Sequence, residues 1–483
     1  MVENIKRRIK NTCSPGTLGM VVASGISVFT FSCNQKEETK PNIIILLTDD
    51  QQWRDLGIMG NEIIKTPHLD HLAANGLLFN NAYVTTSICV CSRASILSGQ
   101  YTSRHGKNSF RDYFTDEEVQ YTYPLLLKNH AEYIIGFIGK YGVGLDYPDK
   151  FYDYWAVEDK TQPDYENYDQ FGNFLHHNDM MENHIIEFLE KFGHSGQPFN
   201  LSVSFKAPHA QDVDPRQFIP QERFIDLYAD IEIPLPETYD SVYYYTKFPE
   251  DFRFVRTADS QVRMNEARRR WGWRFSDPEK YQESIRNYYR LITGVDEVAG
   301  NMMVKLKELG IDNNTIVIFA SDNGFFLAEH GLAGKWYGHQ ESVRIPFFIY
   351  DPRLPENEKG RSINEMTLNI DIAPTILSMA GVNIPEEMQG EDLTVLINGK
   401  QESWRSEFYY EHTIDIATIP KSVGVISEDF TYLKYPELKS GFEELYDLKK
   451  DPMQINNLVD DPFYQDVLEQ YRIKTEEWGL KVK

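Results

Sequence analysis

The chain of 483 residues carries 49 basic and 73 acidic side chains, which gives a formal net charge of −24 at pH 7. This charge excludes a nucleic-acid-binding protein, which needs a basic surface to displace counterions. The hydrophobic content of 41% excludes a globally disordered chain and allows a sizeable core. The length favours one large domain, or a large domain with a smaller one.

The N-terminus is typical of an export signal. Basic residues near the start precede an apolar stretch from about residue 18 to 31, which is too short for an ordinary membrane-spanning helix. The stretch ends at a small residue followed by Cys33, as in the cleavage sites of bacterial lipoproteins. We therefore predict a lipoprotein-type signal segment over residues 1–33 and a polar tether over 34–40. A plain signal peptide cut nearby and an uncleaved anchor are the alternatives.

These features predict the location of the protein. We expect an exported bacterial protein, in the periplasm or at the outer membrane or cell surface as a lipoprotein. Contact with a membrane is expected only through a lipid on Cys33.

The positions of the four cysteines in the sequence indicate different roles for them. Cys13 lies in the expected signal and Cys33 would carry the lipid, so only Cys89 and Cys91 remain in the folded body. A disulfide between residues two apart would be strained, and one such pair is no disulfide scaffold. A buried thiol can be an inert small hydrophobe, but a thiol close to a fixed cation such as Arg93 can form a reactive thiolate. The segment around Cys89 is therefore a candidate site.

Apolar, β-branched runs predict strands that are buried on both faces of a sheet. The buried runs are residues 42–47, 133–138, 199–205, 315–320 and 346–350. A further strand is predicted over residues 79–84, directly before the Cys89 segment.

Two of these runs end in acidic turns. Asp49 and Asp50 follow the first run, and Asp322 and Asn323 follow the run at 315–320. Ligands gather at the carboxyl ends of strands in α/β sheets. Adjacent carboxylates repel each other unless a cation neutralises them, and oxygen-only ligation suits a hard divalent ion. The alternative is a solvated turn.

Helical patterns alternate with the strands. A helix is expected to begin near Ser92, where its N-terminal amides would favour negative charge at Cys89. Other helices are predicted over residues 66–76, 283–309, 371–380 and 462–478. Past about residue 390, polar and apolar residues alternate in short segments, a pattern typical of strands in an antiparallel sheet.

Together these patterns predict an α/β fold. We expect a large mixed, mostly parallel sheet sandwiched by helices over residues 41–390, and a smaller C-terminal α+β subdomain with an antiparallel sheet over 391–483. Residues 212–278 are aromatic, charged and proline-spotted, and we interpret them as an insertion or lid. Trp271 and Trp273 there lie beside several arginines, which could hold a charged sugar. A solvated helix with an aromatic underside explains them equally well.

The predicted strand ends and loops carry a coherent set of polar side chains. A cation with about six oxygen ligands, ringed by positive side chains, suits a tetrahedral oxyanion. No convergent set of histidines and cysteines indicates zinc. The oxygen ligands would be Asp49, Asp50, Asp322 and Asn323, and the positive groups Arg93, Lys140, His209 and Lys335.

The segment from Cys89 to Arg93, followed by Leu97-Ser98-Gly99, resembles the type I sulfatase signature Cys-x-Pro-Ser-Arg with its Leu-Thr-Gly-like end. Other motifs of that family follow in the same order over nearly the whole mature chain. The resemblance implies an alkaline-phosphatase-like fold and a sulfuric ester hydrolase. The further motifs are Asp49-Asp50, Gly139-Lys140, Pro208-His209, Asp322-Asn323-Gly324, Lys335, Gln389-Gly390 and Glu444 to Leu448.

The resemblance also implies roles for these residues. Cys89 would be converted to formylglycine by a formylglycine-generating or an anaerobic sulfatase-maturating enzyme, and its hydrate would attack sulfur. Arg93 would steady that residue, and His209 would protonate the leaving alcohol. Calcium, with magnesium as the alternative, would be held by Asp49, Asp50, Asp322, Asn323 and the modified Cys89, and the sulfate by Lys140 and Lys335.

Two positions depart from the family pattern. Cys91 replaces the usual proline or alanine, and the spacing to Arg93 selects Cys89 as the modified residue. Gly142 stands where the common run Gly-Lys-x-His has a histidine. Glucosamine-6-sulfatase-like members also lack this histidine. His105, His339 and Tyr141 are the candidate substitutes, and the sequence does not choose among them.

The expected substrate is a sulfated mono- or oligosaccharide, such as a glycosaminoglycan or another sulfated glycan, with N-acetylglucosamine 6-O-sulfate as the best single guess. The alternatives are a phosphonate monoester or phosphodiester hydrolase, and a non-catalytic surface lipoprotein that binds sulfated glycans. The side chains proposed to bind substrate are His105, His339, His412, Trp271 and Trp273.

Overall fold

The computed structural model describes residues 39–158, 162–239, 241–256, 261–399 and 403–483. The predicted signal segment and residues 34–38 of the tether lie outside this part of the chain. Residues 40–483 form one compact unit. Among the described residues, no helix has both the length and the apolar character that crossing a membrane requires.

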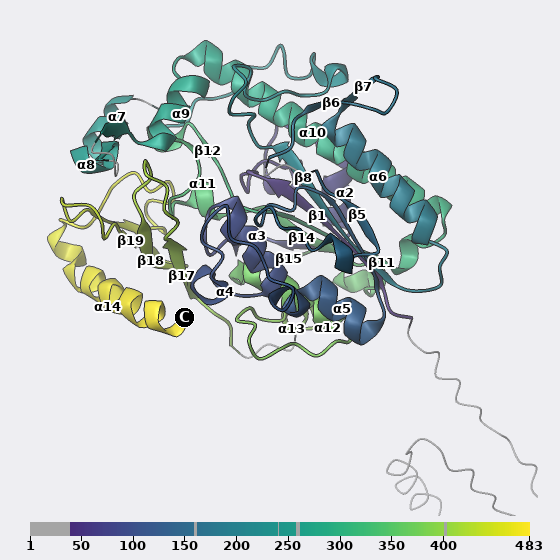
Figure 1. Ribbon diagram of the computed structural model, residues 1–483. Coiled ribbons are helices and arrows are strands. Elements are labelled where there is room, and N and C mark those ends of the chain that lie inside the picture. Colours follow the sequence, from purple (N-terminus) through teal and green to yellow (C-terminus); the bar gives the residue numbers. More distant parts are fainter. Residues whose placement is uncertain (1–38, 159–161, 240, 257–260, 400–402) are drawn as a thin grey trace, which may run out of the picture. The chain divides into compact units, whose positions relative to one another are not determined.

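An eight-stranded mixed sheet forms the centre of this unit (Figure 1). Five neighbouring strands run parallel, β14 runs antiparallel to both of its neighbours, and β15 is parallel to β2. This confirms the predicted mixed, mostly parallel sheet. The strands, in spatial order, are β15 (Arg361–Ile363), β2 (Leu77–Phe79), β14 (Phe347–Tyr350), β11 (Thr315–Ser321), β1 (Asn42–Asp49), β8 (Phe199–Pro208), β4 (Ile134–Gly139) and β5 (Tyr154–Ala156).

Helices cover both faces of the sheet, as its buried strands require. Side chains alternate along β1, so Ile43 and Ile45 enter one hydrophobic core and Ile44 and Leu46 enter the other. The first core is shared with α3 (Cys89–Ser98), α5 (Tyr123–Ala131) and α12 (Ile372–Met379), and the second with α2 (Pro67–Ala74), α6 (His177–Phe192) and α10 (Pro278–Glu308).

Several predicted elements differ in extent, and the helix expected to begin near Ser92 begins at Cys89. The strand expected over 79–84 is divided between β2 and the short β3 (Ala82–Tyr83), because β3 leaves the main sheet and pairs with β16 (Thr367–Leu368), where the Thr367 N–H donates to the Asn81 carbonyl. The long helix begins at Pro278 instead of residue 283, because Asp277 caps it by accepting the Lys280 N–H.

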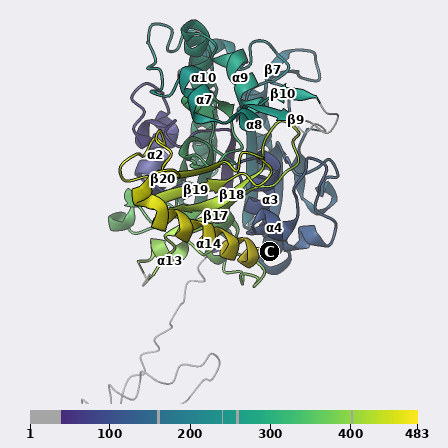
Figure 2. The ribbon, with the colours of Figure 1, turned by 90° about the vertical axis from the view of Figure 1, so that its left-hand side faces the viewer.

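The C-terminal segment forms a separate antiparallel sheet of four strands, as predicted (Figure 2). Helix α14 (Gln465–Lys481) lies across one face and shares a small core that includes Tyr432 and Leu468. The other face, through Phe408 and Leu433, joins a core of the large sheet. The boundary at residue 390 stays a prediction. The strands are β17 (Glu407–His412), β18 (Ser422–Ser427), β19 (Phe430–Lys434) and β20 (Glu443–Asp447).

The remaining helices and strands are short. Most of those in the predicted insertion 212–278 lie near one another in Figure 2. The insertion contains α7 (Ser241–Lys247), α8 (Glu250–Arg253), β9 (Phe254–Arg256), β10 (Val262–Met264) and α9 (Glu266–Arg274). Elsewhere lie α4 (Thr102–His105), α11 (Gln340–Val343), α13 (Thr394–Ile397), β6 (Glu166–Tyr168), β7 (Phe174–His176), β12 (Phe326–Leu327), β13 (Ala333–Gly334) and β16 (Thr367–Leu368).

The packing of α10 generates a stability prediction with a matched control. Val298 is fully buried in this helix, whereas Val304 is 58% exposed. Val298→Ala should lower the free energy of unfolding by about 2 kcal/mol, because it removes buried methyl groups and leaves a cavity. Val304→Ala should change it by less than about 0.5 kcal/mol. Denaturant unfolding of both variants measures the difference, and equal effects would contradict the described packing.

Candidate active site

The candidate site lies at the carboxyl edge of the central sheet. β1 and β11 are parallel and pair Thr48 with Ser321, so the acidic turns that follow them lie side by side. Asp50 adopts a left-handed backbone conformation, and its N–H donates to Asp322 Oδ1 at 3.2 Å. The register of two strands thus brings together carboxylates that are far apart in sequence.

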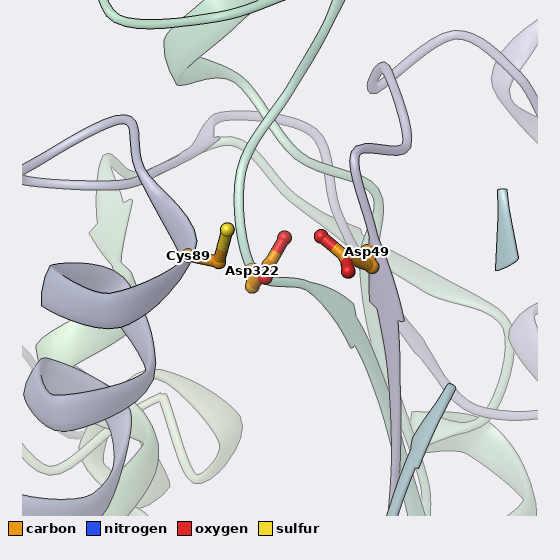
Figure 3. A group of neighbouring side chains, drawn as sticks. All are labelled: Asp49, Cys89 and Asp322. Atoms are coloured by element: carbon orange, nitrogen blue, oxygen red, sulfur yellow. The ribbon is translucent and has the colours of Figure 1, made fainter. Parts of the chain in front are cut away.

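Cys89 faces these carboxylates from the first turn of α3 (Figure 3). Its side chain is buried, and it points with Asp49 and Asp322 toward one common space. One ligand atom of each of the three lies within 4.8 Å of the others, and Asp49, Asp50 and His209 form a second such group. The helix N-terminus adds partial positive charge at Cys89.

The second cysteine does not share this position. Cys91 is fully buried and belongs to the hydrophobic core beneath α3. Burial raises the pKa of the Cys91 thiol well above its usual value. Cys91 is therefore an inert core thiol, whereas Cys89 faces the carboxylates.

Three cationic side chains pair with the buried acids. Lys140 Nζ lies 2.5 Å from Asp49 Oδ2, and Arg93 Nε donates to Asp322 Oδ2 at 2.8 Å. Lys335 Nζ bonds to Asp50 Oδ1 and lies 3.3 Å from Cys89 Sγ.

These charges shift the pKa values of the acids in opposite directions. Burial by itself would raise the pKa of Asp49, but Lys140 and the other nearby cations lower it below its usual value. At Asp322, burial and then the charge of Asp49 raise the pKa above its usual value. The cluster therefore contains one strongly stabilised carboxylate and one whose negative charge is poorly compensated.

His209 has a defined orientation in this cluster. Its Nδ1 lies 2.6 Å from the carbonyl oxygen of Ala210, so Nδ1 carries the proton and donates it to that oxygen. Nε2 then faces Asp50 Oδ2 at 3.5 Å. Burial lowers the pKa of His209 to about 4.

The donor set fits a hard divalent cation. Asp49 Oδ1 and Asn323 Oδ1 are buried and have no hydrogen-bond partner. Buried acceptors without a partner are costly, and carboxylate and amide oxygens are the ligands that calcium prefers. A cation bound here would satisfy both atoms and compensate the charge of Asp322.

A pocket of about 580 Å³ opens above the cluster. Cys89, Lys140, His209 and Lys335 line its floor, and the segment 415–419 of the C-terminal part lines another wall. The floor therefore carries a nucleophile position and positive charge, which suits the binding of an oxyanion.

A third wall of this pocket is formed by Asp212, Glu266 and Arg270. Arg270 is one of the arginines beside Trp271 that were expected to hold a charged sugar, whereas sequence reasoning did not find Asp212 and Glu266. Arg270 donates to Glu266 Oε1 at 2.9 Å and lies 2.8 Å from Asp212 Oδ2. The spacing of four between Glu266 and Arg270 on α9 was readable in the sequence, but the direction in which that face points was not.

The five side chains proposed to bind substrate do not line this pocket. Both ring nitrogens of His105 are engaged, one by Ser95 Oγ and one by the Lys107 N–H. His339 is buried 3.3 Å from Glu444, and His412 is buried within β17.

The two tryptophans of α9 have other neighbours. Trp271 is buried with the Arg268 guanidinium 3.8 Å from its ring centroid. Trp273 is partly exposed beside Arg269. The sequence placed both near arginines correctly, but neither tryptophan lines the pocket.

Gly142, where the common sulfatase run has a histidine, is closed to larger residues. Its φ of +75° is a conformation that glycine favours, and a Cβ there would lie 2.5 Å from Arg93 Cδ. Tyr141, proposed as a substitute, is buried against Phe137 and Trp155 and does not line the pocket.

Known proteins of similar sequence and structure are sulfatases and a related hydrolase. The chain is 28% identical to an N-acetylglucosamine-6-O-sulfatase of Bacteroides thetaiotaomicron, over 92% of this chain and 87% of that one. A protein solved with its substrate D-glucosamine-2-N,6-O-disulfate superposes with a TM-score of 0.75 at 25% identity, covering 92% and 98% of the two chains. The phosphonate monoester hydrolase of Agrobacterium radiobacter superposes with a TM-score of 0.74 at 20% identity, covering 92% and 96%, a likeness of fold alone.

Family models cover almost the whole described chain. Residues 328–479 match the C-terminal region of N-sulphoglucosamine sulphohydrolase, and residues 41–382 match the sulfatase family. The match to the sulfatase family spans the sheet, α3 and the acidic turns on which the site is built. The chain belongs to the sulfatase family and is a sulfuric ester hydrolase.

Proposed function

We propose that this sulfatase hydrolyses an O-sulfate ester of a carbohydrate, with N-acetylglucosamine 6-O-sulfate as the favoured substrate. The observation that carries the proposal is the convergence of Cys89, Asp49 and Asp322 within 4.8 Å, beneath a pocket that Cys89 lines together with Lys140 and Lys335. The sugar-sulfatase assignment is supported by relatives that act on sulfated glucosamine.

Two groups would be added to the chain for this chemistry. Calcium, or magnesium in its place, would be held by Asp49, Asp50, Asp322 and Asn323, and would supply positive charge to the developing oxyanion. Formylglycine would be made from Cys89 by a formylglycine-generating or anaerobic sulfatase-maturating enzyme, and its hydrate would supply the nucleophilic hydroxyl.

The remaining side chains would bind and orient the ester. Lys140 and Lys335 are charge donors on the pocket floor for the oxygens of a sulfate. His209 is held through its Nδ1–H, so Nε2 is the atom that would take up a proton and, from the doubly protonated ring, pass it to the leaving alcohol. Arg93 donates to Asp322 and to the Lys140 carbonyl, which keeps the two sides of the site in register.

The location follows from the N-terminal pattern. We infer an exported bacterial enzyme, in the periplasm or at the cell surface, with Cys33 as the candidate lipid attachment. Phosphonate ester hydrolysis is supported only by likeness of fold. A non-catalytic glycan-binding protein is disfavoured because the nucleophile, acid and cation positions are all filled by competent side chains.

The first prediction concerns the two cysteines. Cys89→Ala should abolish sulfate release from N-acetylglucosamine 6-O-sulfate, because it removes the precursor of the nucleophile. Cys91→Ala should retain activity, since Cys91 lies in the hydrophobic core. Ion chromatography of released sulfate measures both, and peptide mass spectrometry should find an aldehyde at residue 89 only. Sulfate release by Cys89→Ala, or modification at residue 91, would contradict the mechanism.

A second prediction concerns the cation. Calcium at about a hundred times its dissociation constant should stabilise the protein by about 2.7 kcal/mol. Asp322→Asn should remove most of this stabilisation, because it deletes a charged ligand. Asp296→Asn is the matched control and should retain the calcium effect. Asp296 is a buried aspartate of α10 that accepts the Leu69 N–H. Thermal unfolding with calcium or chelator measures the shift, and an equal response of the two variants would exclude the proposed ligand.

A third prediction concerns the missing histidine. Gly142→His should lower activity and stability, because a side chain there is strained by about 1–3 kcal/mol and displaces Arg93. Gly106→Ala is the control for strain alone, since Gly106 has φ +72° and no atom within 4 Å of the added Cβ. A Gly142→Ala variant should lose more stability and more activity than Gly106→Ala. Increased sulfate release by Gly142→His would refute this account of the position.

A further inference from the structure

A second cavity, of about 800 Å³, adjoins the active-site pocket. Asp415, Ile416, Ala417 and Ile419 line both spaces, so the segment 415–419 is a common wall. Both volumes lie in the range of sites that hold small ligands. The second cavity therefore begins where the active-site pocket ends.

The segment that forms the common wall is anchored by buried residues at both ends and is exposed between them. Ile414 and Ile419 are buried in the hydrophobic core, and the Thr418 carbonyl accepts the Glu266 N–H at 3.1 Å. Asp415 and Ala417, between these anchors, are exposed. The wall between the two spaces is therefore open to solvent at Asp415 and Ala417.

The other walls of the second cavity offer an apolar surface. Phe254 and Val255 of β9 are half-buried there, and Leu438 lies across from them in the loop after β19. Aromatic and aliphatic side chains of this kind pack against the apolar face of a sugar ring.

The two spaces differ in charge. Among the described residues, the active-site pocket is lined by three basic side chains, Lys140, Arg270 and Lys335, and by three acidic ones, Asp212, Glu266 and Asp415. The second cavity is lined by four acidic side chains, Glu250, Asp251, Asp415 and Glu437, and by two basic ones, Arg256 and Lys439. Acidic side chains thus outnumber basic ones only in the second cavity, so a sulfate or carboxylate is less favoured there than in the active-site pocket.

We propose that the second cavity binds the sugar residue next to the sulfated one, and that it selects an uncharged neighbour. This inference rests on the proposed function and narrows it. The substrate would be an oligosaccharide in which a sulfated sugar is joined to a neutral hexose, instead of a chain that alternates with uronic acid.

The test compares three probes: N-acetylglucosamine 6-O-sulfate alone, joined to galactose, and joined to glucuronic acid. We expect the galactose disaccharide to exceed the monosaccharide about tenfold in kcat/KM, mostly through KM, because the second sugar buries additional apolar surface. The glucuronic acid disaccharide should show no such gain.

Two variants test the cavity itself. Phe254→Ala should remove most of the disaccharide advantage and leave kcat/KM for the monosaccharide unchanged, which also shows that the variant is folded. Phe174→Ala is the matched control, a 56% exposed phenylalanine on β7 outside both spaces. Glu437→Lys should improve kcat/KM for the glucuronic acid disaccharide, because it adds positive charge at the cavity.

Binding to the Cys89→Ala variant by calorimetry gives a readout that does not depend on turnover. The galactose disaccharide should bind about tenfold more tightly than the monosaccharide. Equal affinities and equal kcat/KM for mono- and disaccharide, preference for the uronic acid, or no disaccharide binding would overturn the inference. Tight disaccharide binding without any sulfate release by the wild type would count against the proposed function alone.

Discussion

The parallel pairing of β1 with β11 is the constraint on which the rest of the site depends. It places Asp49, Asp50 and Asp322 together in a buried space, where like charges repel strongly and water cannot screen them. The arrangement is stable only with positive charge around it, which Arg93, Lys140 and Lys335 supply from three other elements. The proposed chemistry uses the same two features, a set of oxygen ligands and cations directed at an anion.

The structure separates the reacting groups from the walls that would choose the substrate. The reacting groups stand on the ends of sheet strands and on α3, which are packed on both sides. The walls come from α9 in the insertion and from the segment 415–419 in the C-terminal part. Surface segments of this kind can vary without disturbing the sheet, so one catalytic floor can serve different sugars.

Buried histidines illustrate how the sequence can mislead. His339 lies close to Lys335 in sequence, yet it packs against His330 and contacts Glu444 of β20. Lys247 of α7 lies 3.7 Å from the same Glu444, so the cluster connects the insertion with the C-terminal sheet. A histidine can serve such a structural ion cluster or an active site, and its neighbours in sequence do not distinguish the two roles.

The sequence by itself determined the strands and the acidic turns at their ends, because hydrophobic periodicity and turn composition are local properties of the chain. It also singled out Cys89 by its spacing to Arg93, and this choice stays a prediction. It also predicted the mixed sheet and the antiparallel C-terminal sheet. Only the tertiary structure decided that Arg270 faces the pocket, that Arg93 occupies the space beside Gly142 and that one segment separates two cavities. These features depend on the directions of side chains that meet across more than a hundred residues of sequence, or, at Gly142, on backbone geometry, and packing sets both.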